Sequence, residues 1–257
     1  MNIYQHFRED EHPFIDQVLS WREEVERKYA GKLTDFLHPR EQKIMKSIIG
    51  NDDEWKLDFF GGWDNAERQR GYLYPYYEAI DETTFETVLL EASFHEKFVT
   101  ITHRDVLGSF LAAGIHRKKI GDIMIKDGTI QILVSKEITD YLVLNVTSIK
   151  NANVAFETVP LNQLILKDEK WKESHGTGSS LRLDVMIKEM YQVSRQEALQ
   201  LIKKGLVKVN FQIIDNPAFI MEEEDLISVR GKGRARLKML LGRTKKDKIR
   251  FAYEKLI

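Results

Sequence analysis

Residues 85–159 carry the pattern that most restricts the fold, because their apolar spacing switches repeatedly between that of a strand and that of a helix. The expected elements are strands at 98–102, 120–125, 130–134 and 154–158, with helices at 106–111 and 138–149. Asp127-Gly128 is a strong hairpin turn between the second and third of these strands. The order predicts a ferredoxin-like βαββαβ domain, whose sheet a further strand at 85–91 would extend.

RNA-recognition modules share this arrangement, and they stack bases on exposed aromatic residues of the central strands. The strand at 129–135 has no aromatic residue, and we expect Phe94 and Phe98 to lie in the core. The middle domain is therefore expected to be a scaffold without that stacking surface. The cations of residues 116–119 could contact phosphate, but a solvated helix end explains them equally well.

The rest of the chain is expected to form three further parts, which makes the fold class α+β. Residues 1–71 predict a helical N-terminal segment, with one strand at 55–60. Residues 72–169 are the ferredoxin-like middle domain, and the aperiodic residues 170–180 predict a linker. Residues 181–257 predict a small C-terminal α+β domain.

The C-terminal domain shows two short amphipathic helices followed by strands. An apolar stripe from Leu183 to Met190 predicts the first helix. Ser194 and Glu197 are spaced as a capping box that begins the second helix, and Gly205 is placed to end it in a left-handed conformation. Val207, Val209 and Phe211 then share one face of a strand.

Charge is unevenly distributed along the chain. The net charge of the whole chain is −1, but residues 181–257 hold 17 Lys and Arg against 10 Asp and Glu. Residues 230–250 alone hold 10 basic residues and one acid, Asp247. A basic module on an acidic body suggests a polyanionic partner, with nucleic acid the leading candidate and a solvated basic tail the alternative.

Basic residues occupy every second position from 230 to 238. An extended chain would aim all five at one face, about 6.6–6.8 Å apart, which resembles the phosphate spacing of a nucleic-acid strand. A helix beginning near Arg234 would scatter them, and Leu237, Leu240 and Leu241 favour a helix nearby.

The C-terminal motifs resemble the RNA-binding domain of small-subunit ribosomal protein four, the S-four domain. The resemblance covers residues 181–240 and rests on the motifs Arg182-Leu183-Asp184, Ser194-Arg195-x-x-Ala198-x-x-Leu201-Ile202-x-x-Gly205-x-Val207-x-Val209-Asn210, Pro217 and Asp225-x-Ile227-x-Val229-Arg230-Gly231. Many such domains have Gly after the Asn where this chain has Phe211, so the geometry of that turn is open.

The whole chain is similar to the YlmH-like S-four proteins of Gram-positive bacteria. The similarity rests on residues 103–108, 121–123 and 209–217. It implies a non-enzymatic RNA-binding protein associated with the ribosome, and related stand-alone S-four proteins act on large subunits that carry stalled peptidyl-tRNA. Members are encoded beside cell-division genes.

Other function classes lack their motifs. A methyltransferase needs a Gly-rich cofactor loop after a strand, and neither 61–62 nor 176–178 provides one. His95-Glu96 lacks the second His of a zinc helix, and the chain has no cysteine. We expect no cofactor, metal or catalytic residue. The alternatives are an RNA-modifying enzyme with its site in residues 72–165, and a division-site scaffold that binds anionic lipid.

We therefore expect a monomeric, cytoplasmic protein that binds structured ribosomal RNA or tRNA, with the large ribosomal subunit as its setting and no membrane partner. Neither a signal peptide nor a transmembrane run is expected. The expected phosphate contacts are Arg182, Arg195, Lys203, Lys204, Lys208, Arg230, Lys232 and Arg234. Ser194, Gln196 and Asn210 are expected to add neutral hydrogen bonds.

Overall fold

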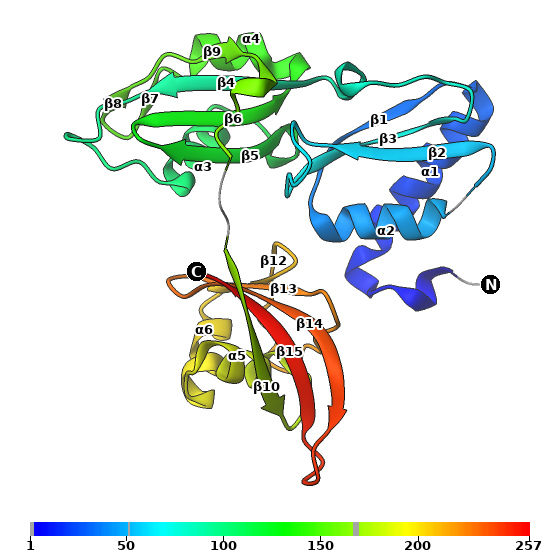
Figure 1. Cartoon of the computed structure of the whole chain (residues 1–257), viewed down its shortest axis with the longest axis vertical. Coiled ribbons are helices and arrows are strands. Elements are labelled where there is room, and N and C mark those ends of the chain that lie inside the picture. The colour runs from blue at the N-terminus through cyan, green and yellow to red at the C-terminus, as the bar shows by residue number, and fades with distance from the viewer. Residues whose placement is uncertain (1–2, 51, 167–169) are drawn as a thin grey trace. The chain divides into compact units, whose positions relative to one another are not determined.

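The computed structural model describes residues 3–50, 52–166 and 170–257. The chain forms two compact units, Met1–Lys167 and Asp168–Ile257 (Figure 1). Short 3-10 helices lie at Ile3–His6, Glu9–Glu11, Glu82–Phe85, Arg117–Lys119, Lys136–Ile138 and Leu161–Gln163. None of the helices in the described ranges is long and apolar enough to cross a membrane.

The first unit begins with two helices on a three-stranded antiparallel sheet of order β1-β3-β2. Its elements are α1 (His12–Lys28), β1 (Lys32–Leu37), α2 (Pro39–Ile49), β2 (Trp55–Phe60) and β3 (Gln69–Pro75). The predicted helical character appears in α1 and α2, and the strand at 55–60 is confirmed as β2. The segment also contains β1 and β3, which the sequence did not predict. β3 is the central strand and buries both its faces, so its sequence does not alternate.

The middle of the first unit is ferredoxin-like, as predicted. Its elements are β4 (Thr87–Ser93), α3 (His103–Ala112), β5 (Ile120–Lys126), β6 (Thr129–Ser135), α4 (Thr139–Asn145) and β9 (Glu157–Val159), with a small hairpin of β7 (Ser148–Ile149) and β8 (Ala152–Asn153). The sheet order is β5-β6-β4-β9, with antiparallel pairs throughout. Asp127 and Gly128 form the expected turn, with φ of 48° and 74°.

The first strand of this domain is the further strand expected at 85–91, and the strand expected at 98–102 does not form. β4 spans Thr87–Ser93, whereas residues 98–102 are outside any strand. The alternation at 98–102 is a loop whose Ile101 is buried and whose Phe98 is 87% exposed. The assignment of Phe98 to the core is therefore wrong, and that of Phe94, which is 9% exposed, is confirmed.

One face of the ferredoxin-like sheet packs on α3 and α4 and forms the larger core of the unit, through residues such as Ile132 and Phe110. The opposite face is also closed. Leu89, Met124 and Leu133 pack there against Phe36 of β1. Gly121 allows this approach, since a Cβ there would lie 2.8 Å from the Phe36 ring.

The segment after β9 closes the rest of that face. Gln131, which is fully buried on β6, donates from Nε2 to the Gln163 carbonyl at 2.9 Å and accepts the Ile165 amide at 2.6 Å. Leu161, Leu164 and Ile165 pack over the same cluster. The surface that stacks bases in RNA-recognition modules is thus occupied by the chain itself.

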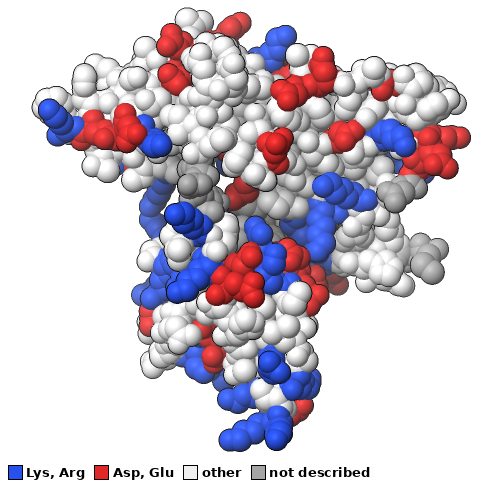
Figure 2. All heavy atoms as spheres, viewed as in Figure 1, with Lys and Arg blue, Asp and Glu red and all other residues white. Residues whose placement is uncertain are grey.

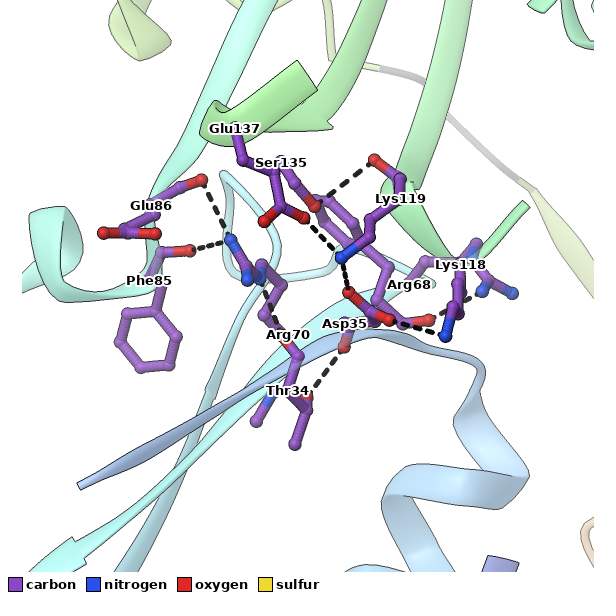
Figure 3. A network of polar contacts seen from close by, with 12 residues as sticks. Thr34, Asp35, Arg68, Arg70, Phe85, Glu86, Lys118, Lys119, Ser135 and Glu137 are labelled. Carbon is purple, nitrogen blue, oxygen red and sulfur yellow. Dashed lines mark hydrogen bonds and ion pairs between the residues drawn. The ribbon is translucent and has the colours of Figure 1, made fainter. Parts of the chain in front are cut away.

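Buried arginines join the two halves of the first unit (Figure 3). Arg68 donates to the carbonyls of Phe36 at 2.7 Å and Ile120 at 3.2 Å. Arg70 donates to Thr34 at 2.8 Å and Phe85 at 3.0 Å. Burial lowers the pKa of both guanidinium groups. The carbonyl oxygens replace the hydrogen bonds to water that the guanidinium groups lose on burial.

The second unit is a six-stranded antiparallel sheet of order β10-β15-β14-β13-β11-β12, with two helices on one face. Its elements are β10 (Trp171–Gly178), α5 (Leu183–Tyr191), α6 (Arg195–Lys203), β11 (Val207–Val209), β12 (Gln212–Ile213), β13 (Leu226–Val229), β14 (Gly233–Arg243) and β15 (Ile249–Leu256). The two predicted helices are confirmed, and Gly205 has the expected positive φ of 66°.

Two expectations about this unit are corrected. Residues 170–180 were expected to be a linker, but β10 pairs with β15 along its whole length. The sequence of β10 shows no alternation of apolar residues, because Gly176 takes an inward position under the Phe251 ring, where a Cβ would be 2.6 Å away. The helix suggested near Leu237 is also absent, since β14 continues to Arg243 and its apolar residues pair across to β15.

The fold generates a prediction about acid stability at the start of α2. The Nδ1 atom of His38 accepts the Glu41 amide at 3.4 Å, and Glu41 Oε2 accepts the His38 amide at 2.8 Å. Burial, with Arg68 nearby, lowers the pKa of His38 to about 3. The unfolded chain therefore binds a proton below about pH 6.5 that the folded chain excludes, so stability falls as the pH falls.

We expect this histidine to remove about 2 kcal/mol of stability between pH 7 and pH 5, from about 1.36 kcal/mol per pH unit below 6.5. His38→Asn keeps a cap acceptor without the titration. Urea unfolding at both pH values should show a smaller acid loss in the variant. An equal loss in both proteins would mean that His38 is protonated in the folded chain.

Candidate nucleic-acid interface

A buried carboxylate organises two of the predicted contact residues. Asp184 in the first turn of α5 has a fully buried side chain. Arg182 Nε lies 3.0 Å from its Oδ1, and Arg195 Nε and Nη2 each lie 3.0 Å from its Oδ2. Asp184 therefore brings together two arginines that lie 13 positions apart in the sequence.

The arginines also determine the charge of this carboxyl group. Burial alone would raise the pKa of Asp184, but hydrogen bonds from Arg182 and Arg195 outweigh it and lower the pKa below its usual value. The group is thus an ionised anchor at neutral pH. The Arg195 side chain remains 60% exposed, so its other donors face solvent.

The N-terminus of α6 is capped as expected, but by only half of a capping box. Ser194 Oγ accepts the Glu197 amide at 3.0 Å. The Glu197 carboxylate instead lies 2.9 Å from Lys232 Nζ. Lys232 belongs to the turn between β13 and β14, so this ion pair holds that turn beside the first turn of α6. Gln196 is exposed next to it.

The same turn reaches the other end of α6. The Arg230 amide donates to the Leu206 carbonyl at 2.9 Å, next to Lys203 and Lys204 at the end of the helix. α6 and this turn therefore form one basic surface, which we call the α6 surface. It comprises Arg182, Arg195, Gln196, Lys203, Lys204, Arg230 and Lys232.

Lys208 and Arg234 belong to a different surface. Lys208 pairs with Ser228, and Ser228 pairs with Arg234, so the three residues form a row across β11, β13 and β14. Their neighbours Val207 and Ala235 are buried against the helices, which places the row on the opposite face of the sheet. The eleven expected residues therefore do not form a single cluster.

The alternating cations are extended, as one interpretation of the sequence proposed, but their charges are unequally available. Arg234, Arg236 and Lys238 share one face of β14. Arg236 stacks over the Trp171 ring at 5.0 Å and lies 3.9 Å from Glu254. Lys238 lies within 3.9 Å of Glu254 and 3.7 Å of Glu224, so this part of the strand is largely neutralised.

Asn210 is the expected contact residue whose position argues against RNA binding. Its side chain is buried, at 8% exposed. Its Nδ2 donates to Asp225 at 2.6 Å, and its Oδ1 accepts the Leu226 amide at 3.0 Å. Both polar ends are thus used inside the fold, and its neutral hydrogen bonds position β13 rather than a ligand.

The turn at Asn210-Phe211 keeps the geometry that Gly usually provides. The φ angles of the two residues are 47° and 72°, as in a type I′ turn. A left-handed conformation costs a bulky residue roughly 1–2 kcal/mol. The bonds of Asn210 to Asp225 and Leu226 hold the turn in place despite this cost.

The orienting role of Asp184 and the neutralising role of Glu254 were not predicted from the sequence. Asp184 has a detectable signal, because it is a carboxylate between Leu183 and Val185 in an otherwise apolar turn, where burial requires a cationic partner. Glu254 has none, since its pairing follows from the β14–β15 register. Within the described residues, no group of three or more His, Asp or Glu is placed to hold a metal ion.

The geometry defines a class of protein that combines a ferredoxin-like domain with a basic S4-type domain. Three family models match the chain: "YlmH, N-terminal" at residues 10–77, "Putative RNA-binding domain in YlmH" at 81–163 and "S4 domain" at 181–227. The chain belongs to the YlmH family.

Two relatives agree with this assignment. The chain is 41% identical, over 99% of its length and 98% of the relative's, to "Ribosome-associated protein quality control protein P2" of Bacillus subtilis (strain 168). A solved structure of "Cell division protein ylmH from Streptococcus pneumoniae" matches with a TM-score of 0.55 and 31% identity. That match covers 64% of this chain and all of the solved one.

The burial of Asn210 generates a prediction. Asn210→Gly keeps the left-handed turn but leaves the buried Leu226 amide without its acceptor, so we expect about 2 kcal/mol loss of unfolding free energy. Phe211→Gly in the same turn is the matched control and should change stability by less than about 1 kcal/mol. Guanidinium unfolding measures both. Full stability of Asn210→Gly would show that the side chain is not structural.

Proposed function

We propose that this chain is a non-enzymatic RNA-binding protein that acts on ribosomal RNA or tRNA at the ribosome. The proposed role is in translation, in the quality control of stalled large subunits, and the protein would act as a cytoplasmic monomer. The S4 match, the family's RNA-binding description and the ribosome-associated relative support this proposal.

The observation that carries the proposal is the pair of arginines on Asp184. A guanidinium group binds phosphate through two parallel N–H donors, and it does so best when its orientation is already fixed. Asp184 holds one edge of Arg195 while most of the side chain is exposed. Because Asp184 already holds the side chain in place, Arg195 loses less conformational entropy when phosphate binds.

Unpaired cations extend this site along α6. Lys203, Lys204 and Arg230 are exposed and form no ion pair with any described residue. They can therefore neutralise phosphates without first breaking an internal contact, and each such contact releases counterions. Lys232 is paired with Glu197 and Ser194 caps its own helix, so neither would be a primary phosphate contact.

The middle domain would not bind RNA in the manner of an RNA-recognition module. Phe36, Leu133 and the residues around Leu164 cover the face on which such modules stack bases. The proposal therefore assigns phosphate binding to the α6 surface, with the row at Lys208 and Arg234 as a second, weaker contact.

The proposal predicts opposite effects for two substitutions that each remove one negative charge. Asp184→Asn releases Arg182 and Arg195, so we expect RNA affinity to fall by about threefold to tenfold, roughly 1 kcal/mol, although the net charge becomes more positive. Glu197→Gln releases Lys232 without disturbing the arginines, so affinity should stay the same or rise. Arg195→Ala should cost about 1–3 kcal/mol.

Fluorescence anisotropy with a ribosomal RNA fragment at fixed salt measures all three variants, with circular dichroism to confirm folding. Tighter binding by Asp184→Asn would show that total charge, rather than the orientation of the arginines, controls affinity. Unchanged affinity of Arg195→Ala at low salt would remove Arg195 from the site.

A further inference from the structure

The β14–β15 hairpin ends in a second concentration of positive charge. Figure 2 shows Lys and Arg gathered where this hairpin ends, beyond the rest of the second unit. This basic tip comprises Arg243, Lys245, Lys246, Lys248 and Arg250, with Asp247 as its only acid. It lies outside residues 181–227, which the S4 family model matches.

The tip is held by its own hydrogen bonds. The Thr244 amide donates to the Lys248 carbonyl at 2.8 Å, and the Lys248 amide donates to Thr244 Oγ1 at 3.1 Å. Asp247 has a left-handed φ of 56° and lies 2.8 Å from Arg243. The single acid therefore shapes the turn through Arg243, and Lys245, Lys246 and Lys248 form no ion pair with any described residue.

β14 connects the basic tip to the α6 surface. The strand begins at Gly233, directly after the turn that carries Arg230 and Lys232, and ends at Arg243. Ten steps of about 3.3 Å separate the two ends by roughly 30 Å, allowing for the two irregularities in its register. Pairing with β13 and β15 makes this connection stiff.

The charges along β14 are arranged unevenly. Beyond its two ends, Arg230 on one side and Lys245, Lys246 and Lys248 on the other are exposed and form no ion pair with any described residue. Arg236 and Lys238 between them face Glu254 and Glu224. The positive charge is therefore available at two separate sites rather than along the whole strand. Two cationic sites held at a fixed distance fit a stiff polyanion whose negative groups lie at the same separation.

We propose that the basic tip is a second RNA contact, which binds the backbone of the same RNA about one duplex turn from the α6 surface. This inference rests on the proposed function. One turn of the A-form duplex that RNA adopts rises roughly 30 Å, close to the length of β14. Duplex RNA is the fitting partner because a flexible single strand would not hold its phosphates at that separation.

The test compares stem-loop RNAs of 6 and 18 base pairs that share one loop. Only the longer stem can reach both sites, since 6 base pairs of A-form RNA span about 17 Å at roughly 2.8 Å each. The tip variant combines Lys245→Gln, Lys246→Gln and Lys248→Gln. The matched control combines Lys43→Gln, Lys56→Gln and Lys136→Gln, which remove the same charge from exposed positions of the first unit.

We expect the tip variant to bind the long stem at least tenfold more weakly and with a salt slope lower by about 2–3, at roughly 0.9 per phosphate. Its affinity for the short stem should be unchanged, and the control should match the native chain on both RNAs. Equal weakening on both stems, or no weakening on the long stem, would overturn the two-contact inference.

Arg195→Ala, measured in parallel on both stems, separates this inference from the proposed function. Loss of binding by Arg195→Ala together with an unaffected tip variant would refute the basic tip alone. If neither variant weakened binding to either stem, the α6 surface would be refuted as well.

Discussion

The packing of Phe36 on Leu133 determines which surfaces of the first unit remain open. It closes the face of the ferredoxin-like sheet that related folds use for RNA, with Gly121 permitting the close approach. Arg68 and Arg70 cross the same junction and satisfy carbonyls on both sides of it. Opening that face would expose apolar side chains and leave buried polar groups without partners. Bases therefore cannot stack on that face, and the proposed phosphate contacts lie in the second unit.

In the second unit, carboxylates rather than cations determine where charge is available. Asp184 orients two arginines, and Glu197 fixes the β13–β14 turn through Lys232. Glu254 and Glu224 neutralise the middle of β14. The acids thus divide a strongly basic segment into an organised site at one end and an exposed tip at the other. A count of basic residues would not reveal this division, because the pairing depends on which carboxylates the strand register places beside each cation.

The sequence predicted local elements where one face was buried and the other solvated. α5, α6, the Asp127-Gly128 turn and the ferredoxin-like order are confirmed. The failures have a common physical cause, which is contact with a distant segment. β3 is covered on both faces, and β10 is built of small and polar residues because Phe251 supplies its apolar cover. Asn210 was predicted to contact RNA from its residue type and its motif. Its hydrogen bonds to Asp225 and Leu226 depend on tertiary structure, which the sequence does not show. Apart from the corrected linker, the predicted domain boundaries stay predictions, and so does RNA binding by the α6 surface.

RNA binding by the second unit can be tested by ultraviolet crosslinking of the full chain in cells, followed by sequencing of the RNA and mass spectrometry of the crosslinked peptides. We expect the RNA to be ribosomal RNA or tRNA and the crosslinked peptides to lie within residues 182–250. Crosslinks confined to residues 81–165, or RNA drawn mainly from messenger sequences, would contradict this expectation.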